Sequence, residues 1–245
     1  MQLKESYMRT TATYSTNGKS ISAELFTPST AHDDRLIVLA HGSDGLVDSS
    51  NGPWKSFIEG YATDLAEMGI VTVIPDYFAA SATVAGDLDP TDPISYVKQI
   101  AANRSTWVTA LKDATHELSK PSIVPGIDPS RIGLLGFSLG GHLCARLAGD
   151  AKAAVLFFPP YMIDGLGKLG SLSTFVEIHH GARDFLPYSQ NAEVIHTKLS
   201  GAGAQSTLWP AYPGAVHGFV GHDADNTSAR NLSRARTLAF FDLRL

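Results

Sequence analysis

Three observations predict an α/β fold with a mainly parallel sheet and helices on both of its faces. Short apolar runs of strand length alternate along the chain with segments whose apolar residues recur at helical spacing. The runs are apolar throughout, which is typical of strands that are covered on both faces. Turn-forming pairs such as Asn17-Gly18 and Pro75-Asp76 separate the segments.

The first half of the chain opens with a predicted hairpin. Residues 9–16 and 19–26 are expected to form two strands around Asn17-Gly18, a pair that favours a two-residue hairpin turn. This hairpin would add an antiparallel edge to the sheet. Further on, we expect buried strands at residues 36–40 and 70–74, helices at residues 53–68 and 94–118, and a surface loop at residues 79–93.

The second half continues the alternation of strands and helices. The expected strands lie at residues 132–137, 153–158, 174–179 and 206–209, and the expected helices at residues 141–147, 188–199 and 228–241. Residues 161–173 are Gly-rich and predict a loop. The chain contains no linker, repeat or low-complexity segment, so we expect a single domain over residues 1–245.

Composition restricts the class of protein. The 245 residues are 44% hydrophobic and 18% charged, which is ordinary for a globular protein. A net charge of −5 without a basic run argues against a nucleic-acid partner. The single cysteine, Cys144, excludes an intramolecular disulfide and favours a reducing compartment. Neither a signal peptide nor a membrane-spanning run is evident, so we expect a cytoplasmic protein without a membrane partner.

The segment 131–149 carries the strongest functional signal. Gly136-Phe137-Ser138-Leu139-Gly140, a G-x-S-x-G, lies between the predicted strand and a small apolar helix. A serine on so sharp a turn needs these glycines, because side chains there would clash where the backbones approach. The helix N-terminus beside the serine favours negative charge. This context predicts a nucleophile elbow, and a Gly/Ser-rich turn without chemistry is the alternative.

Two further polar residues are expected at the same edge of the sheet as Ser138. Asp184 follows the predicted strand 174–179, and His217 follows the predicted strand 206–209. The carboxyl ends of parallel strands share one edge, and the chain order Ser, Asp, His is the one that α/β-hydrolases use. His217 would take the proton of the serine hydroxyl. Asp184 would select the tautomer of the imidazole and stabilise its charged form.

An anion that forms during acyl transfer needs hydrogen-bond donors. The backbone N–H of Leu139, directly after Ser138, is the first candidate. The N–H of Ser43, in the loop after the strand 36–40, is the second. His41 is expected to orient this loop.

Other residues compete for these roles. Asp164 could replace Asp184 as the acid, because some hydrolases take the acid from the end of the preceding strand. A metal site is an alternative for the histidines at positions 41, 142, 179, 180 and 217, but their spacing matches no ligand pattern. We expect neither a metal nor a cofactor.

The chain resembles the dienelactone hydrolase family of α/β-hydrolases. The matching segments are LIVLAHGSDGL (36–46), GIVTVIPDYF (69–78), RIGLLGFSLGGH (131–142), HHGARDFLP (179–187) and YPGAVHGF (212–219). The resemblance implies an eight-stranded hydrolase core without a large lid domain. It also carries the catalytic triad onto Ser138, Asp184 and His217.

The chain departs from the best-known members of this family at three places. Those members use a cysteine nucleophile, whereas Ser138 suits ordinary ester hydrolysis. Gly42 stands where they place a glutamate after the first core strand, and Ala79-Ala80 and Val220-Gly221 stand where they place arginines that hold a substrate carboxylate. A neutral substrate is therefore favoured over an anionic lactone.

The residues expected near the site are apolar or aromatic, which suggests a neutral, apolar or aromatic substrate. The candidate substrate contacts are Leu46, Tyr77, Phe78, Tyr161, Phe185 and Phe219, each of which could also belong to the core. We predict a serine hydrolase that cleaves small or medium carboxylic esters through an acyl-enzyme on Ser138. A peptidase or an acyltransferase on the same triad, or a non-catalytic binding protein with this fold, is the alternative.

Overall fold

The computed structural model describes residues 6–30, 32–49, 52–89, 92–162, 165–185 and 190–245. The chain divides into two compact units. The first contains residues 1–39 and 43–132, and the second contains residues 40–42 and 133–245. Each unit contains parallel strands. The expectation of a single domain over residues 1–245 stays a prediction.

The first unit is built on the predicted N-terminal hairpin. Strands β1 (Tyr7–Thr16) and β2 (Lys19–Pro28) pair antiparallel, with Thr16 opposite Lys19. Asn17 and Gly18 both have positive φ, at 47° and 74°, which is the backbone that a tight hairpin turn requires. β2 then pairs antiparallel with β6 (Val71–Pro75), and β6 pairs parallel with β3 (Leu36–Ala40).

Two helices complete the first unit. Helix α1 (Trp54–Glu67) buries an apolar face that includes Ile58 and Leu65. Helix α2 (Pro93–Glu117) begins after Asp92, whose carboxylate accepts a hydrogen bond from the N–H of Ser95 at 3.1 Å. A two-stranded ribbon of β4 (Asp48–Ser49) and β5 (Gly52–Pro53) precedes α1 and was not expected.

The segment 79–93, expected as a surface loop, is partly built into the first unit. Its start belongs to the 3₁₀ helix η1 (Tyr77–Ser81), and Ala80 and Leu88 are buried. The indole N–H of Trp107 donates a hydrogen bond to the hydroxyl of Ser81 at 2.7 Å. The expectation was wrong there, because small and acidic composition does not reveal which few residues of a segment face a neighbouring helix.

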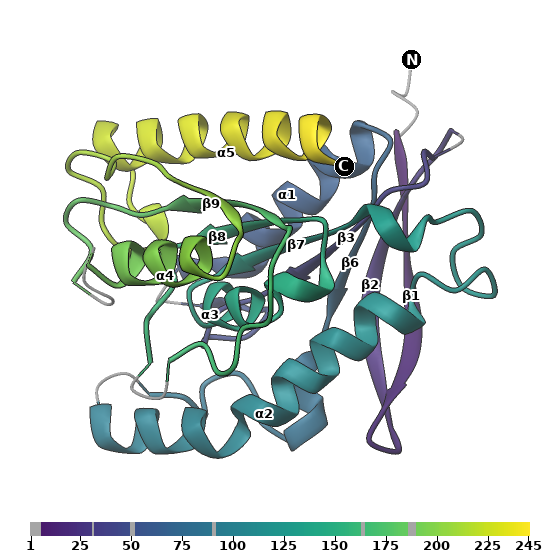
Figure 1. Ribbon diagram of the computed structural model, residues 1–245, viewed down its shortest axis with the longest axis horizontal. Coiled ribbons are helices and arrows are strands. Elements are labelled where there is room, and N and C mark those ends of the chain that lie inside the picture. Colours follow the sequence, from purple (N-terminus) through teal and green to yellow (C-terminus); the bar gives the residue numbers. More distant parts are fainter. Residues whose placement is uncertain (1–5, 31, 50–51, 90–91, 163–164, 186–189) are drawn as a thin grey trace. The chain divides into compact units, whose positions relative to one another are not determined.

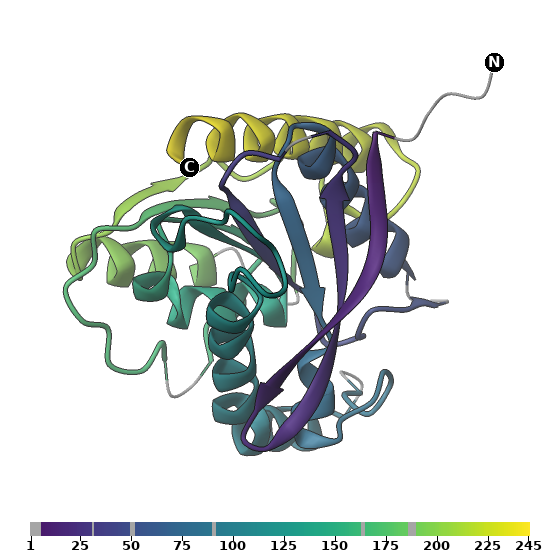
Figure 2. The same cartoon turned by 90° about the vertical axis from the view of Figure 1, so that its right-hand side faces the viewer.

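The second unit carries four parallel strands, β7 (Ile132–Phe137), β8 (Ala153–Phe157), β9 (Phe175–His179) and β10 (Gln205–Leu208). Helix α5 (Ala224–Arg244) lies on one face of these strands, and α3 (Leu139–Arg146) and α4 (Gln190–Gly201) lie on the other (Figures 1 and 2). Short 3₁₀ turns occur at Pro129–Arg131, Ala148–Asp150 and His217–Phe219.

The predicted fold class is confirmed. The strands run in the order β1-β2-β6-β3 in the first unit and β7-β8-β9-β10 in the second, and together they form an eight-stranded, mainly parallel sheet with the antiparallel pair β1–β2. β3, β6, β7 and β8 are buried at every residue, as expected for strands with helices on both faces.

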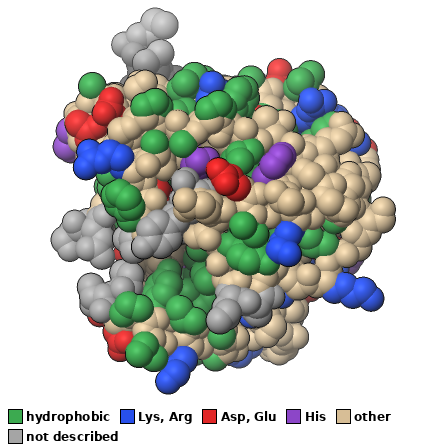
Figure 3. Space-filling view, turned by 60° about the vertical axis from the view of Figure 1, so that its left-hand side comes forward, with side chains coloured by type: hydrophobic (Ala, Val, Ile, Leu, Met, Phe, Trp, Pro, Cys, Tyr) green, Lys and Arg blue, Asp and Glu red, His purple; other side chains and the backbone are tan. Residues whose placement is uncertain are grey.

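The surface of the described residues mixes all side-chain types. On the face shown in Figure 3, Lys and Arg side chains stand apart from one another among acidic, apolar and neutral groups. No helix in the described part of the chain is both long and apolar enough to cross a membrane.

Candidate active site

Ser138 lies at the junction between β7 and α3, as the G-x-S-x-G pattern predicts. Its backbone has φ 52° and ψ −116°, a left-handed conformation that is rare for a residue with a side chain. A Cβ at Gly136 would come within 2.4 Å of Gly140 O, and one at Gly140 within 2.1 Å of Ala40 O. Both positions therefore require glycine, for the close approach that was inferred from the sequence.

The three residues singled out as a triad are joined by hydrogen bonds within the second unit. His217 Nε2 lies 3.1 Å from Ser138 Oγ, and His217 Nδ1 lies 2.9 Å from Asp184 Oδ2. Because the carboxylate accepts only, the network assigns the imidazole proton to Nδ1 and leaves Nε2 to accept from the serine hydroxyl. This arrangement can withdraw a proton from Ser138.

Asp184 is held in place by the backbone around it. It is 3% exposed, and it follows a turn in which its N–H donates to Gly181 O at 3.3 Å. That turn is joined to the histidine loop by the N–H of Arg183, which donates to Ala215 O at 2.9 Å. The alternative acid, Asp164, lies outside the described residues.

His217 is partly accessible, with 22% of its side chain exposed. It begins the short turn His217–Phe219, in which Gly218 has φ 70° and Phe219 φ 53°. The ring of Phe158 packs edge-on against the imidazole, with the ring centroids 4.9 Å apart. Phe158 itself has φ 38° at the end of β8, so a second strained residue supports the histidine.

The candidate oxyanion donors come from two units. The N–H of Leu139 is the first in α3 and has no acceptor within that helix. Ser43 belongs to the first unit, is 8% exposed, and its side chain is hydrogen-bonded to Tyr96. Its role in the oxyanion hole stays a prediction.

Gly42, the residue before Ser43, lies beside the serine. A Cβ built at Gly42 would be 3.4 Å from Ser138 Cβ. The neighbouring His41 is 1% exposed, and its Nδ1 lies 2.8 Å from Gly42 O. Burial lowers the pKa of His41 to about 4, so the imidazole is neutral near pH 7 and its Nδ1–H can donate to that carbonyl. The orienting role expected of His41 stays a prediction, which this contact supports.

The remaining histidines have separate surroundings. His142 Nδ1 lies 2.9 Å from Pro160 O. His179 Nδ1 lies 2.8 Å from the hydroxyl of Tyr212, and His180 is 6% exposed. Among the described residues, no three His, Cys, Asp or Glu side chains gather in a group that could hold a metal ion.

The candidate substrate contacts fall into different environments. Tyr77 and Phe78 are buried in the first unit, where their rings pack against each other and against Trp107. Phe219 is buried against Phe158.

The other three candidates reach the surface to different degrees. Leu46 is half-buried in the first unit. Phe185 is 66% exposed directly after the acid, so it is free to meet a bound molecule. Tyr161 is half-buried in the second unit.

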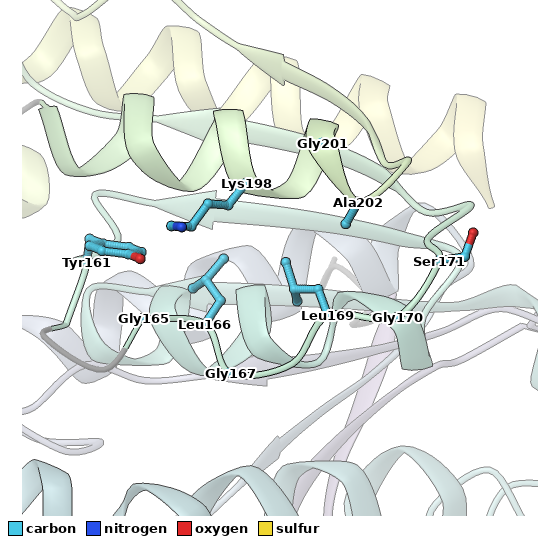
Figure 4. Close-up of a pocket in the computed structure, with 10 residues that line it drawn as sticks. All are labelled: Tyr161, Gly165, Leu166, Gly167, Leu169, Gly170, Ser171, Lys198, Gly201 and Ala202. Atoms are coloured by element: carbon cyan, nitrogen blue, oxygen red, sulfur yellow. The ribbon is translucent and has the colours of Figure 1, made fainter.

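Tyr161 lines a pocket of about 630 Å³ that lies along α4 and the glycine-rich residues 165–171 (Figure 4). Lys198 of α4 points toward Tyr161 in this view, and its Nζ lies 5.7 Å from the centre of the phenol ring. The pocket lining does not include the three residues of the candidate triad.

Sequence reasoning missed two residues that support the site. Phe158 was expected only as the end of a strand, although the following Pro159-Pro160 marks a sharp exit of the chain there. Asn226 lies in the first turn of α5, and its Oδ1 accepts a hydrogen bond from the N–H of Val216 at 3.0 Å. The signal for it was Asp223, a helix-capping residue three positions earlier.

Solved structures share this fold. A dienelactone hydrolase-like promiscuous phosphotriesterase from metagenomic libraries is 19% identical with a TM-score of 0.75, and the match covers 98% of this chain and 99% of the other. A cold-adapted esterase from an Arctic intertidal metagenomic library is 20% identical with a TM-score of 0.68, over 98% and 95% of the chains. An esterase from the archaeon Pyrobaculum calidifontis is 19% identical with a TM-score of 0.67, over 96% and 82%.

The sequence comparisons identify a family but no individual relative. No curated protein sequence matches the chain. The family model for dienelactone hydrolases matches residues 21–244, which is almost the whole chain and includes the elbow, the acid loop and the histidine loop. The chain therefore belongs to the dienelactone hydrolase family, a family of carboxylic ester hydrolases.

Proposed function

We propose that the protein is a serine esterase that cleaves carboxylic esters through an acyl-enzyme on Ser138. The observation that carries this proposal is the pair of contacts from Ser138 Oγ to His217 Nε2 (3.1 Å) and from His217 Nδ1 to Asp184 Oδ2 (2.9 Å). These contacts join a nucleophile, a base and an orienting carboxylate in the order that acyl transfer requires.

Acylation begins with proton transfer from Ser138 Oγ to His217 Nε2 while the oxygen attacks the ester carbonyl carbon. The carbonyl π bond opens and its electrons move onto the oxygen. The N–H of Leu139, with that of Ser43, is proposed to stabilise this anion, and loss of one such donor typically costs about 10²–10³-fold in rate. Asp184 stabilises the imidazolium through its contact with Nδ1.

The tetrahedral intermediate then collapses, and the bond to the alcohol oxygen breaks. The proton on His217 Nε2 passes to the leaving alcohol, which restores the neutral imidazole. A water molecule takes the place of the alcohol, gives its proton to Nε2 and attacks the acyl carbon. The second collapse releases the acid and returns the proton to Ser138 Oγ. These steps use only side chains, backbone N–H groups and water.

The substrate class we propose is a neutral ester of small or medium size. Phe185 is exposed directly after the acid, so an aromatic surface beside the candidate triad is available to a bound group. Two of the structural neighbours are esterases by name, which is consistent with a small-molecule substrate.

We also infer that the protein works in the cytoplasm. Its single cysteine, Cys144, is buried in α3, and burial raises the pKa of the thiol, which keeps it protonated and unreactive. An unpaired thiol is compatible with a reducing compartment. Fractionation of cells that express the tagged protein would test this location.

The decisive experiment is labelling with a fluorophosphonate, which reacts with activated serines, followed by peptide mass spectrometry. We expect one adduct on Ser138 and ester turnover that falls by roughly 10⁴–10⁶-fold in Ser138→Ala. Ser105→Ala, at an exposed serine on α2, is the matched control and should behave like the wild type. Turnover that survives in folded Ser138→Ala would sink the assignment, and parallel assays with amides and acyl acceptors separate an esterase from a peptidase or an acyltransferase.

A further inference from the structure

A chain of polar side chains crosses the interior of the second unit and takes no part in the proposed mechanism. It begins at Arg236 on α5, continues through Tyr212 in the segment after β10, and ends at His179 and Glu177 on β9. His179 is 0% exposed and Glu177 is 5% exposed. Ionisable groups are costly to bury, so their presence on a core strand calls for a role.

The hydrogen bonds run in one direction along this chain. Arg236 Nη1 can only donate, and it donates to the Tyr212 hydroxyl at 3.0 Å. The hydroxyl proton is then available to His179 Nδ1, which lies 2.8 Å away. With Nδ1 accepting, the imidazole proton lies on Nε2. Glu177 Oε1 lies 2.8 Å from Nε2, close enough for an ion pair but without the alignment of a hydrogen bond. The hydroxyl of Tyr212 is therefore held from two sides.

The protonation states agree with this direction. Burial lowers the pKa of His179, which favours the neutral imidazole, and burial raises the pKa of Tyr212, which keeps its hydroxyl protonated. The guanidinium of Arg236 also stacks on Trp209, with its carbon 3.7 Å from the ring centroid. The donor at the start of the chain is thereby fixed in position.

Tyr212 joins the acid loop to the histidine loop through its backbone. The N–H of Ala182 donates to Tyr212 O at 2.9 Å, and the N–H of Tyr212 donates to His180 O at 3.0 Å. Gly181 pairs with Tyr212 as an isolated parallel bridge. Asp184 follows three residues after Gly181, so these backbone contacts tie Tyr212 to the loop that carries the acid.

Tyr212 also supports His217 through ring packing. Its ring lies 5.3 Å from that of Phe219, at an interplanar angle of 74°. Phe219 lies 5.3 Å from Phe158, and Phe158 lies 4.9 Å from the imidazole of His217. The ring of Tyr212 is thus joined to the imidazole of His217 through the edge-to-face contacts of Phe219 and Phe158.

We propose that Tyr212 is a positioning residue, and that the polar chain Arg236–Tyr212–His179–Glu177 fixes its side chain so that Asp184 and His217 stay aligned. This inference rests on the proposed function, because alignment matters only if the two residues serve Ser138. The polar chain affects the proposed reaction through the position of His217, and none of its side chains touches a reacting atom.

The test uses Tyr212→Phe, which removes the hydroxyl and keeps the ring. We expect the rate of fluorophosphonate labelling and kcat to fall about 10-fold, because small misplacements of catalytic groups cost rates of this order. KM should stay within about twofold, and the final labelling should still reach one adduct per chain. A merely structural role would lower the final stoichiometry through unfolded protein and leave the rate per folded site unchanged.

Tyr14→Phe is the matched control. Tyr14 is buried in the first unit, and its hydroxyl has no hydrogen-bond partner among the described residues. This variant should label at the wild-type rate. A Tyr212→Phe variant that labels as fast as wild type would overturn the proposal, as would an equal slowing in Tyr14→Phe.

His179→Asn tests whether the polar chain acts as a unit, because asparagine can still accept from Tyr212 but cannot reach Glu177. The double variant Tyr212→Phe/His179→Asn should label no more slowly than the slower of the two single variants. If the fold-changes of the two single variants instead multiply in the double variant, the two residues act independently and the polar chain is not a unit.

If Tyr212→Phe does not fold, Arg236→Met removes the donor from the helix side and should slow labelling in the same way. Labelling of Arg236→Met at the wild-type rate would overturn the proposal.

The outcomes distinguish this inference from the proposed function. If wild-type Ser138 is not labelled, the proposed function fails and the positioning role fails with it. If Ser138 is labelled in the wild type and equally fast in Tyr212→Phe, only the positioning role fails.

Discussion

At the scale of single residues, backbone strain is concentrated around the candidate site. Ser138, Phe158 and Phe219 are three of the five non-glycine residues with positive φ in the described part of the chain. Such conformations cost about 1–3 kcal/mol each and persist only where the surroundings enforce them. Of these three residues, Ser138 belongs to the candidate triad, Phe158 packs against His217, and Phe219 packs against Phe158. A precise orientation of side chains matters most at this place.

Gly140 provides the first prediction at this scale. Gly140→Ala would place a methyl group 2.1 Å from a backbone oxygen of Ala40, which cannot rotate away. We expect a loss of about 3 kcal/mol or more in the free energy of unfolding, measured by urea denaturation. Gly42→Ala, whose methyl would meet Ser138 Cβ at 3.4 Å, should fold normally and serves as the control. Equal stability of the two variants would contradict the close approach.

The identity of the acid is the second prediction. Asp184→Asn should lower kcat by roughly 10²–10⁴-fold, because the amide can no longer stabilise the imidazolium and favours the wrong tautomer. Asp164→Asn removes the competing carboxylate and should leave kcat close to the wild-type value. The reverse pattern, with activity lost only in Asp164→Asn, would transfer the role to Asp164.

At the scale of elements, the start of α5 holds the loop that carries His217. Asp223 caps the helix by accepting from the N–H of Asn226 at 2.9 Å. Asn226 is 3% exposed and accepts from the N–H of Val216, next to His217. Arg230, one turn on, donates to Gly221 O at 2.7 Å. The helix therefore contributes to the site although none of its residues belongs to the triad.

Asn226→Ala tests this contribution. It leaves the half-buried N–H of Val216 without its acceptor, which should cost about 1 kcal/mol and slow the labelling of Ser138 several-fold. Asp92→Ala removes the cap of α2 in the first unit and should cost about 1 kcal/mol with no change in labelling rate. Labelling kinetics at a temperature where both variants are folded distinguish the two effects, and equal rates would contradict the role of Asn226.

At the scale of the whole molecule, buried histidines make stability depend on pH. Burial lowers the pKa of His41, His179 and His180, so the unfolded chain binds protons at these residues before the folded protein does. Stability is therefore complete above the unfolded pKa of 6.5 and falls as pH decreases toward the folded pKa, which for His41 is about 4.

The corresponding prediction concerns urea denaturation between pH 7 and pH 4. His41 alone should reduce the free energy of unfolding by about 3 kcal/mol over this range. His41→Asn, which can still donate to Gly42 O, should flatten the dependence by a similar amount. A wild-type protein that is as stable at pH 4 as at pH 7 would contradict a neutral, buried His41.

Several structural elements were predictable because their signals are local. The strand 36–40 and the strand 132–137 match β3 and β7 residue for residue, since an uninterrupted apolar run has clear ends. Helix α5 extends from Ala224 to Arg244, beyond the predicted 228–241, because its cap at Asp223 and its polar first turn carry no apolar periodicity. The aromatic residues at 77 and 78 carried no signal that separates a binding surface from a core.

By itself, the sequence determined the α/β class, the family, and the three residues that the structure joins as a candidate triad. Glycine spacing, apolar runs and the order Ser138, Asp184, His217 are local or sequential properties that survive without coordinates. Only the tertiary structure decided that Phe158 backs His217, that Asn226 holds Val216, and that Tyr212 is fixed from Arg236 to Glu177. These contacts join residues far apart in the chain, and only packing brings them within reach of one another.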